Sequence, residues 1–205
     1  GPLTVNGFSK AGYSFNGWNT KADGTGASYK DAAIVSNLAS EDGKIVTLYA
    51  KWQPNRYTIQ FNGNGNTGGS MTDQSFMYDV QQNLSANGFV KTGSEFAGWS
   101  ASADGTGTSY APGQAVINLL DEDGTSITLY AKWTVKQYTI TFKSDSNTVY
   151  HTVTGSYGTA VVKPADPKKT GYNFSKWSQT VPAAMPAGDL TLIAEWNVVR
   201  WFIDY

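Results

Sequence analysis

The chain of 205 residues contains no cysteine, one histidine and few charged residues, which make up 15% of its length. The absence of cysteine excludes disulfides, thiolate zinc sites and a cysteine nucleophile. Fifteen basic residues nearly balance sixteen acidic ones, so charge gives no reason to expect nucleic acid or an anionic membrane as a partner. No apolar run reaches the roughly 18 residues that a membrane-spanning helix needs, and we expect no membrane insertion.

Aromatic residues and glycine are abundant instead. Trp, Tyr and Phe make up 14% of the chain, which disordered chains do not carry, so we expect it to fold despite its 22 glycines. The polar residues are mainly Gly, Ser, Thr, Asn and Gln rather than Lys and Glu, which excludes a coiled coil or a helical bundle. No stretch is apolar enough for one large core, so small units are expected.

An internal repeat organises the sequence. Gly17-Trp18 recurs as Gly98-Trp99, and residues 48–52 recur as residues 129–133, each pair 81 residues apart. A third, shorter copy with the same landmarks ends at Trp196. Such repeats form tandem modules, because each copy is one structural unit that packs on its neighbours.

The repeat also predicts where each module begins and ends. An aromatic residue follows five positions after each closing tryptophan and opens the next copy, as Tyr57 follows Trp52. Gly1 and Pro2 have the form of a tag-cleavage scar, so we expect an excised fragment of a longer protein. The predicted modules are a truncated repeat at 3–53, a complete long repeat at 54–135, a complete short repeat at 136–197 and the first strand of a following repeat at 198–205. The first three are named the first, second and third repeats.

Alternating apolar and polar residues predict β-strands. Tyr57, Ile59 and Phe61 alternate with polar residues, which is the period of a strand with one buried face. A similar alternation covers residues 76–80, and an aromatic strand is expected around residues 96–99. The closing segment of each repeat keeps its apolar residues on one inward face: Val46, Leu48, Ala50 and Trp52; Ile127, Leu129, Ala131 and Trp133; Leu190, Leu192, Ala194 and Trp196.

Evidence for helices is weak by comparison. Residues 33–39 and 79–86 could each form two helical turns, but helices that short are marginal without packing. Asp-Gly pairs supply the positive φ that tight turns require, at residues 23–24, 42–43, 104–105 and 123–124. The predicted fold is mostly β (α+β), with tandem small modules that each have a short sheet of about four strands and at most one short helix.

Several short motifs of the second repeat form a specific combination. They are Tyr57-x-Ile59-x-Phe61 followed by a Gly-rich turn, Phe76-x-Tyr78, Asn87-Gly88-Phe89, Gly93-x-x-Phe96-x-Gly98-Trp99, Asp104-Gly105-x-Gly107-x-x-Tyr110 and Leu129-Tyr130-Ala131-Lys132-Trp133. This combination resembles the Listeria/Bacteroides repeat, the internalin B-type repeat of bacterial surface proteins, over essentially the whole chain. The resemblance implies a β-grasp-like module, strung in tandem on secreted, cell-wall-attached or surface-exposed proteins, that serves adhesion or spacing and lacks catalysis.

The third repeat departs from this pattern. Lys176 stands at the position of Gly17 and Gly98, and residues 185–187 replace a long loop. We therefore expect its loops to differ in shape while its strand pattern survives.

Three features suggest other functions. Residues 63–68 match the dinucleotide-binding fingerprint Gly-x-Gly-x-x-Gly, but a strand is predicted where that site needs a helix, which favours a hairpin loop. Acidic residues at 41–43 and 121–124 suggest calcium, although their consecutive spacing favours solvated turns. His151 has no nucleophile motif beside it, which favours a surface or edge position. We expect no enzyme activity, no cofactor and no metal, with calcium at the acidic turns as the alternative.

The aromatic residues fall into two groups. Six tryptophans occupy equivalent positions in the repeats and are predicted to pack in module cores: Trp18, Trp52, Trp99, Trp133, Trp177 and Trp196. Four tyrosines are candidate ligand contacts, because the face of a sugar ring can stack on an exposed aromatic ring. Tyr49 and Tyr130 are predicted to point away from the inward face, and Tyr29 and Tyr110 follow glycine-rich loops.

These features favour a structural and adhesive function. The first hypothesis is a non-catalytic repeat region that acts as an adhesin stalk or spacer and as a protein-interaction module on a bacterial surface. An extracellular location is predicted, with a protein or glycan of a host or neighbouring cell as partner. The linkers at 53–56 and 134–137 are short enough to restrict bending, which suits a stalk.

Two further hypotheses concern binding. The alternative function is that of a carbohydrate-binding accessory module of a secreted enzyme. Self-association by strand exchange is also expected, because the first repeat lacks its opening strand and an unpaired edge seeks a partner. Trp201, Ile203 and Tyr205 would fill that place in a neighbouring chain.

Overall fold

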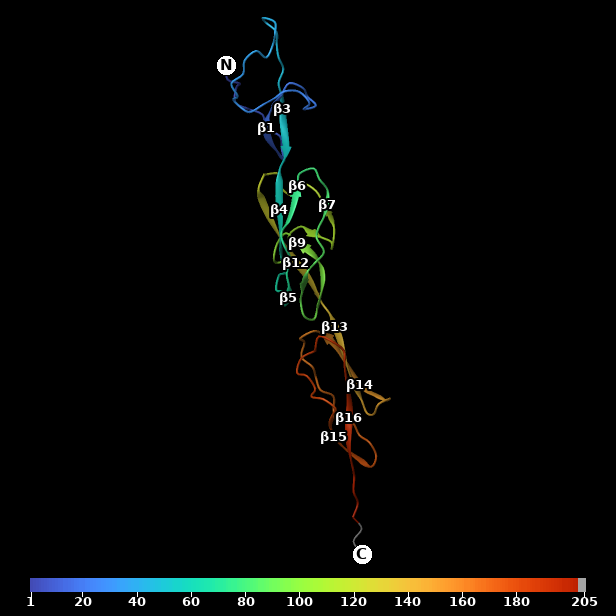
Figure 1. The fold of residues 1–205 in the computed structure, drawn as a ribbon. Coiled ribbons are helices and arrows are strands. Elements are labelled where there is room, and N and C mark those ends of the chain that lie inside the picture. Colours follow the sequence, from blue (N-terminus) through green and yellow to red (C-terminus); the bar gives the residue numbers. More distant parts are fainter. Residues whose placement is uncertain (203–205) are drawn as a thin grey trace. The chain divides into compact units, whose positions relative to one another are not determined.

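A computed structural model describes residues 1–202, and every regular element in them is a β-strand (Figure 1). The prediction of a mostly β fold is confirmed. Because residues 1–202 contain no helix, none of them belongs to a helix that is long and apolar enough to cross a membrane. The chain divides into two compact units: residues 1–64, 70–88 and 98–131 form the first, and residues 65–69, 89–97 and those from 132 onward form the second.

The first repeat forms a three-stranded antiparallel sheet. Its strands are β1 (Tyr13–Asn19), β2 (Ser28–Tyr29) and β3 (Tyr49–Pro54), in the order β2-β1-β3. The pairing of β1 with β3 shifts register between Phe15 and Trp18. Gly17 lies in this bulge with φ +95°, and a Cβ on it would stand 2.5 Å from the carbonyl oxygen of Tyr29. Glycine is therefore required where β2 approaches β1.

The second repeat has a larger main sheet. The strand order is β10-β9-β12-β4-β6, built from β4 (Arg56–Asn62), β6 (Gln74–Met77), β9 (Ser94–Ser100), β10 (Ser109–Tyr110) and β12 (Thr125–Val135). β4 and β12 are parallel neighbours. Two short ribbons also occur: β5 (Gly68–Gly69) with β8 (Phe89–Val90), and β7 (Gln82–Asn83) with β11 (Ala115–Val116).

The third repeat keeps the central strands. Its order is β14-β13-β16-β15, from β13 (Gln137–Lys143), β14 (Val149–Ser156), β15 (Tyr172–Trp177) and β16 (Leu190–Val198). β13 and β16 are parallel, as β4 and β12 are in the second repeat. Among the described residues, no counterpart of β2 or β10 pairs with β15. This difference explains why Lys176 fits where Gly17 and Gly98 stand in the other repeats.

The predicted inward faces form the cores of the second and third repeats, whereas Val46, Leu48 and Ala50 of the first repeat are only half-buried. Leu129, Ala131 and Leu192 are fully buried. Trp18, predicted as a core residue of the first repeat, is only half-buried, whereas its counterparts Trp99 and Trp177 are buried as predicted. Each of these two buried rings packs on a phenylalanine of the opening strand, with centroid distances of 4.8 Å between Phe61 and Trp99 and 4.9 Å between Phe142 and Trp177.

The closing tryptophans are half-buried rather than central. Each lies edge-on to a phenylalanine in the same geometry in all three repeats. The pairs are Phe15 with Trp52 at 5.7 Å, Phe96 with Trp133 at 5.8 Å and Phe174 with Trp196 at 6.0 Å between centroids. These half-buried tryptophans thus have the edge-to-face geometry that aromatic pairs prefer.

The two candidate helices do not form. Residues 79–86 turn at Asp79, which has φ +60°, and continue into β7. Residues 33–39 form no helix, and Asn37 within them has φ +53°. A residue in the left-handed region cannot continue a right-handed helix. The strand predicted at 76–80 ends at Met77, immediately before this turn.

The connections between repeats are shorter than the predicted four-residue linkers. β3 and β4 are separated by Asn55 alone, and β12 and β13 by Lys136 alone (Figure 1). β16 ends at Val198, and residues 199–202 form no strand. Of the strand predicted at 198–205, Ile203 and Tyr205 lie outside the described residues. The module boundaries themselves stay a prediction.

Candidate functional site

The first and second repeats meet at a junction around Asn55. The backbone N–H of Asn55 donates to the carbonyl of Gly12 at 2.8 Å, and the N–H of Tyr78 donates to the carbonyl of Asn55 at 2.9 Å. Gly12 is buried with φ +75°, and a Cβ on it would overlap the ring of Tyr78. Gly12, Asn55 and Tyr78 are named the first junction.

The side chain of Asn55 adds to the first junction. It is 7% exposed, accepts a hydrogen bond from Ser14 Oγ at 2.6 Å and donates from Nδ2 to the carbonyl of Asp121 at 2.6 Å. Asp123 Oδ1 accepts the N–H of Arg56 at 2.8 Å. The acidic turn at 121–124 thus binds the start of β4.

Tyr13, Asp79 and Asn118 form a polar contact beside the first junction. The hydroxyl of Tyr13 donates to Asp79 Oδ2 at 2.6 Å, and Asn118 Nδ2 donates to Asp79 Oδ1 at 2.8 Å. These hydrogen bonds, the one from Tyr13 first, lower the pKa of Asp79. The bond to Asp79 raises the pKa of Tyr13. The contact is therefore complete while Tyr13 is protonated and Asp79 is ionised.

The second and third repeats are joined in the same way. The N–H of Lys136 donates to the carbonyl of Gly93 at 2.8 Å, and the N–H of Tyr157 donates to the carbonyl of Lys136 at 2.9 Å. Gly93 is buried with φ +68°, and a Cβ on it would overlap the ring of Tyr157. This second junction uses the same backbone groups as the first.

A hydrogen-bonded loop follows β1 in the first repeat. The fully buried Asn19 donates from Nδ2 to the carbonyls of Gly24 and Gly26 at 3.1 and 3.0 Å. Its Oδ1 accepts the N–H groups of Lys21 and Gly26 at 2.8 and 3.0 Å. Gly24 has φ +77°, which confirms the predicted Asp-Gly turn.

The equivalent loop of the second repeat is organised around Asp104. Its Oδ1 accepts the N–H of Thr106 at 3.0 Å and the hydroxyls of Ser102 and Thr106 at 2.7 Å each. These bonds, led by the Thr106 N–H, lower the pKa of Asp104 to about 2. Gly105 has φ +79°, so the predicted turn is confirmed here too.

The four candidate tyrosines occupy equivalent positions in the first two repeats. Tyr29 and Tyr49 belong to the first repeat, and Tyr110 and Tyr130 are their counterparts in the second. Tyr29 on β2 is paired with Trp18, and Tyr110 on β10 is paired with Trp99. Tyr29, Tyr110 and Tyr130 are half-buried. Burial raises the pKa of the Tyr110 hydroxyl.

Tyr49 is the exposed member of this set, at 42%. It lines a hollow of about 450 Å³ on the first repeat, together with Phe8, Lys10, Trp18 and Trp52. The hollow offers aromatic surface beside one cationic side chain. Tyr49 is thus the candidate contact whose ring is most accessible to a ligand.

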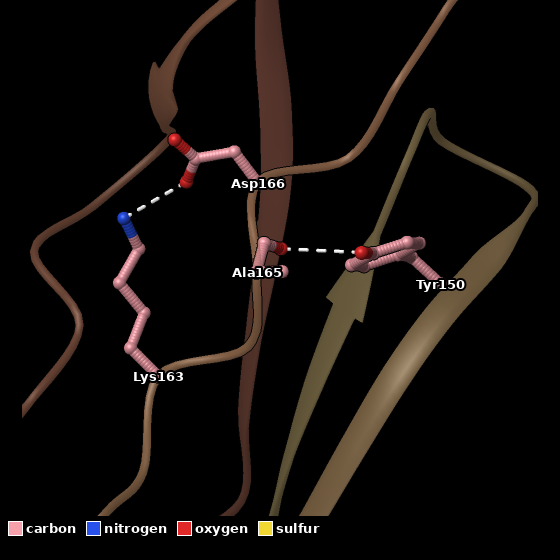
Figure 2. Close-up of polar contacts among 4 residues, drawn as sticks. All are labelled: Tyr150, Lys163, Ala165 and Asp166. Carbon is pink, nitrogen blue, oxygen red and sulfur yellow. Dashed lines mark hydrogen bonds and ion pairs between the residues drawn. The ribbon is translucent and has the colours of Figure 1, made fainter.

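A groove of about 610 Å³ in the third repeat was not predicted; Phe174 and Trp177 are among its lining residues. Figure 2 shows how the neighbouring loop is held. Lys163 Nζ lies 3.0 Å from Asp166 Oδ1, and the hydroxyl of Tyr150 donates to the carbonyl of Ala165 at 3.1 Å. Both charged side chains are more than half exposed, at 51% and 58%, so this ion pair adds little stability.

The remaining sequence motifs have structural positions. Residues 63–68 lead from β4 into β5, and a strand provides no helix N-terminus for a pyrophosphate. His151 is exposed on the edge strand β14. Within residues 1–202, no three His, Asp or Glu side chains gather in the way that a metal site requires.

Sequence reasoning placed Tyr78 in the family motif and Asn55 and Lys136 in the linkers, but it missed the junctions that they form. Gly12 and Gly93 lie 81 residues apart, the same offset that relates Trp18 to Trp99, so the repeat contained a signal. That signal does not identify the partner. Only the folded chain brings each glycine beneath a tyrosine of the next repeat.

Small β-sheet modules joined head to tail through a recurring junction define a tandem-repeat protein. Comparison with known families agrees with this class. The Listeria-Bacteroides repeat domain matches residues 3–51, 57–132 and 138–195, and the chain belongs to that family.

Two relatives are similar to this chain. A protein of Evansella cellulosilytica named "Putative Gly-rich membrane protein" is 31% identical over 208 residues, which cover 96% of this chain and 24% of the relative. Internalin H of Listeria monocytogenes is 34% identical over 118 residues, which cover 53% of this chain and 20% of internalin H. The chain therefore spans about a quarter or less of the length of these relatives.

Proposed function

We propose that this chain is a non-catalytic repeat region of a bacterial cell-surface or secreted protein, where it acts as an adhesin stalk or spacer whose loops contact proteins. Membership of the Listeria-Bacteroides repeat family supports the proposal, as do the similarities to internalin H and to a protein named as a membrane protein. On this proposal the chain is extracellular, and its partner is a protein or glycan of a host or neighbouring cell.

The recurring junction is the observation that carries the proposal. A spacer has to resist bending between neighbouring modules, which flexible linkers do not. Each junction has two backbone hydrogen bonds and a glycine–tyrosine contact beside a one-residue connection. Because both junctions use the same backbone groups with different side chains around them, we attribute local stiffness to the repeat rather than to one pair of modules.

We also infer a reduced β-grasp topology for the modules. In the third repeat, the hairpin of β13 and β14 comes first, and β16 returns parallel to β13 in the centre of the sheet. A β-grasp sheet has this mixed order with a helix packed on one face. Residues 157–171, which connect β14 to β15, would take the place of that helix.

Spin labels test the stiffness of the first junction. The chain has no cysteine, so Asn16→Cys and Ser75→Cys place labels only on exposed positions of β1 and β6 within the first unit. Double electron–electron resonance is expected to give a narrow distance distribution. Tyr78→Ala should broaden it, because the ring over Gly12 is lost, whereas Tyr157→Ala in the second junction should leave it unchanged. A broad distribution with both tyrosines present would contradict the proposal.

Carbohydrate binding, as an accessory module of a secreted enzyme, is the second candidate function. The exposed ring of Tyr49, in a hollow shared with Trp18 and Trp52, favours it. Retardation in polysaccharide-containing gels is the test. Specific retention that Tyr49→Ala abolishes would support this function, with half-buried Tyr110→Ala as the comparison. Equal mobility of the chain in gels with and without polysaccharide would contradict carbohydrate binding.

Strand exchange between chains also stays a proposal. Trp201 is 85% exposed, so an apolar ring near the end of the chain is free to meet a partner. Light scattering over a range of concentrations tests whether chains associate. Association that disappears on deletion of residues 198–205 would support exchange, and a monomer at every concentration would count against it.

A further inference from the structure

The third repeat carries the parts of another junction. Gly171 has φ +78°, close to the +75° of Gly12 and the +68° of Gly93. The N–H of Val199 donates to the carbonyl of Gly171 at 3.0 Å. The glycine and its backbone hydrogen bond are therefore already arranged as in the first and second junctions.

The position of Val199 matches as well. It stands three residues after the closing Trp196, which is the spacing of Asn55 after Trp52 and the spacing in the second junction. In both junctions the residue at this place also accepts a hydrogen bond, from the N–H of a tyrosine in the next repeat. The carbonyl of Val199 is the equivalent acceptor.

What covers the glycine is different. Gly12 and Gly93 are buried under a tyrosine ring, whereas Gly171 is exposed, and apart from its two chain neighbours no described residue has an atom within 4 Å of a Cβ built on it. Trp201 shows the same contrast. It is 85% exposed, but its counterpart Tyr57, five residues after a closing tryptophan, is 1% exposed.

We propose that Gly171, Tyr172 and Val199, named the open junction site, dock a further β-repeat in the manner of the two junctions. A tyrosine of the docked module packs on Gly171 and donates its N–H to the carbonyl of Val199. The occupant is therefore a repeat that has a tyrosine-bearing turn, like residues 78–79 after β6 of the second repeat. This inference rests on junction geometry and does not depend on the spacer function.

The residue after the glycine indicates which turn fits. In the first junction, Tyr13 follows the glycine and donates to Asp79, the residue after the capping tyrosine. In the second junction, Ser94 follows the glycine, and Gly158 takes the place of the carboxylate. The first junction has both a tyrosine hydroxyl after the glycine and a carboxylate after the capping tyrosine. The second junction has neither group.

The open junction site resembles the first junction, in which a tyrosine follows the glycine. Tyr172 follows Gly171 and is 39% exposed. Lys169 Nζ lies 4.5 Å from the centroid of its ring, as Lys10 Nζ lies 3.6 Å from that of Tyr13. The open junction site is therefore selective for a Tyr-Asp turn over a Tyr-Gly turn.

An extended chain tests the proposal. Residues 56–135 are added after Val199 in place of residues 200–205, which puts a second copy of the turn at 78–79 next to the open junction site. Gly171→Ala strains a positive φ in both chains, but only the extended chain adds overlap with a tyrosine ring. We expect a larger loss of melting temperature in the extended chain than in the parent chain. Gly158→Ala, also at positive φ with no atom within 4 Å, should lower both equally.

Hydrogen exchange gives a second readout that does not depend on the glycine variant. The amide of the added capping tyrosine should exchange about tenfold more slowly than in the extended chain carrying Tyr172→Ala. Replacing the added Tyr-Asp turn by Tyr-Gly should remove most of this protection. Equal effects of Gly171→Ala in both chains, or no protection of that amide, would overturn the proposal. Concentration-dependent protection of Gly171 in the parent chain would also overturn it, because a second copy would then be the occupant.

Discussion

The ring of Tyr157 lies directly over the α-carbon of Gly93, where a Cβ would overlap it. Tyr78 and Gly12 have the same relationship one repeat earlier. In each case the glycine adopts a positive φ and accepts a backbone hydrogen bond from the residue that joins two repeats. The contacts that connect neighbouring modules therefore recur with the repeat.

Gly12→Ala should destabilise the first unit more than an ordinary glycine substitution. Strain at positive φ costs about 1 kcal/mol, and overlap with the ring of Tyr78 adds about 1–3 kcal/mol. Gly113→Ala is the matched control, since Gly113 has φ +68° and nothing within 4 Å of a Cβ. Gly113→Ala should lower the unfolding free energy only by the strain of placing alanine at a positive φ. Chemical denaturation followed by circular dichroism measures both, and equal losses would show that Tyr78 does not pack as described.

Trp99→Ala should cost about 3–5 kcal/mol of unfolding free energy, because its fully buried ring packs on Phe61. Trp201→Ala removes a ring that is 85% exposed and should change stability by less than about 0.5 kcal/mol. The pair is compared by denaturant unfolding, with circular dichroism as the signal. A small loss for Trp99→Ala would place this tryptophan outside the core.

Asn19→Ala should destabilise the first repeat by about 1–3 kcal/mol, because it removes the buried amide that forms partly buried hydrogen bonds with the N–H of Lys21 and the carbonyl of Gly24. Asn16→Ala is the control, since Asn16 is exposed and its bond to Gln53 is 3.4 Å long. Amide exchange of residues 20–26 should rise in Asn19→Ala alone. Unchanged exchange would mean that another group holds the loop.

The contact between Tyr13 and Asp79 should make the first junction sensitive to pH. The pKa of Asp79 is lowered, so its contribution is present above the ordinary value of about 4 and is lost as pH falls through the folded pKa. The pKa of Tyr13 is raised, so its contribution is present below about pH 10 and is lost as pH rises through the folded pKa.

Tyr13→Phe isolates this pH effect. The variant keeps the ring against Tyr78 but cannot donate to Asp79. Its melting temperature should fall below that of the unsubstituted chain near neutral pH, and the two should converge at acid and alkaline extremes. A constant difference across the whole pH range would show that the lost hydroxyl acts by another route.

Much of the module fold was predictable because strand alternation and the 81-residue offset are properties of the linear sequence. The inward face of Leu129 and Ala131 followed directly from that alternation and is confirmed. The helix considered at 79–86 fails because Asp79 accepts hydrogen bonds from Tyr13 and Asn118 in a left-handed turn. Those partners lie 66 and 39 residues away in sequence, so no local pattern reveals them.

The candidate sites were harder to predict for the same reason. Tyr49 was expected to be accessible and is exposed, but its counterpart Tyr130 is half-buried. Equivalent positions in a repeat share a backbone but not the side chains and strands packed around them. The junction glycines were visible in the sequence only as repeated glycines, because their role depends on a tyrosine of the next module.

Hydrogen-bond scalar couplings measured by nuclear magnetic resonance test the recurring junction most directly. They report an N–H donor and its carbonyl acceptor as a bonded pair. We expect couplings from Asn55 to Gly12 and from Tyr78 to Asn55, and the same pattern from Lys136 to Gly93 and from Tyr157 to Lys136. Absence of these couplings, together with fast exchange of the four amides, would contradict a junction encoded in the repeat.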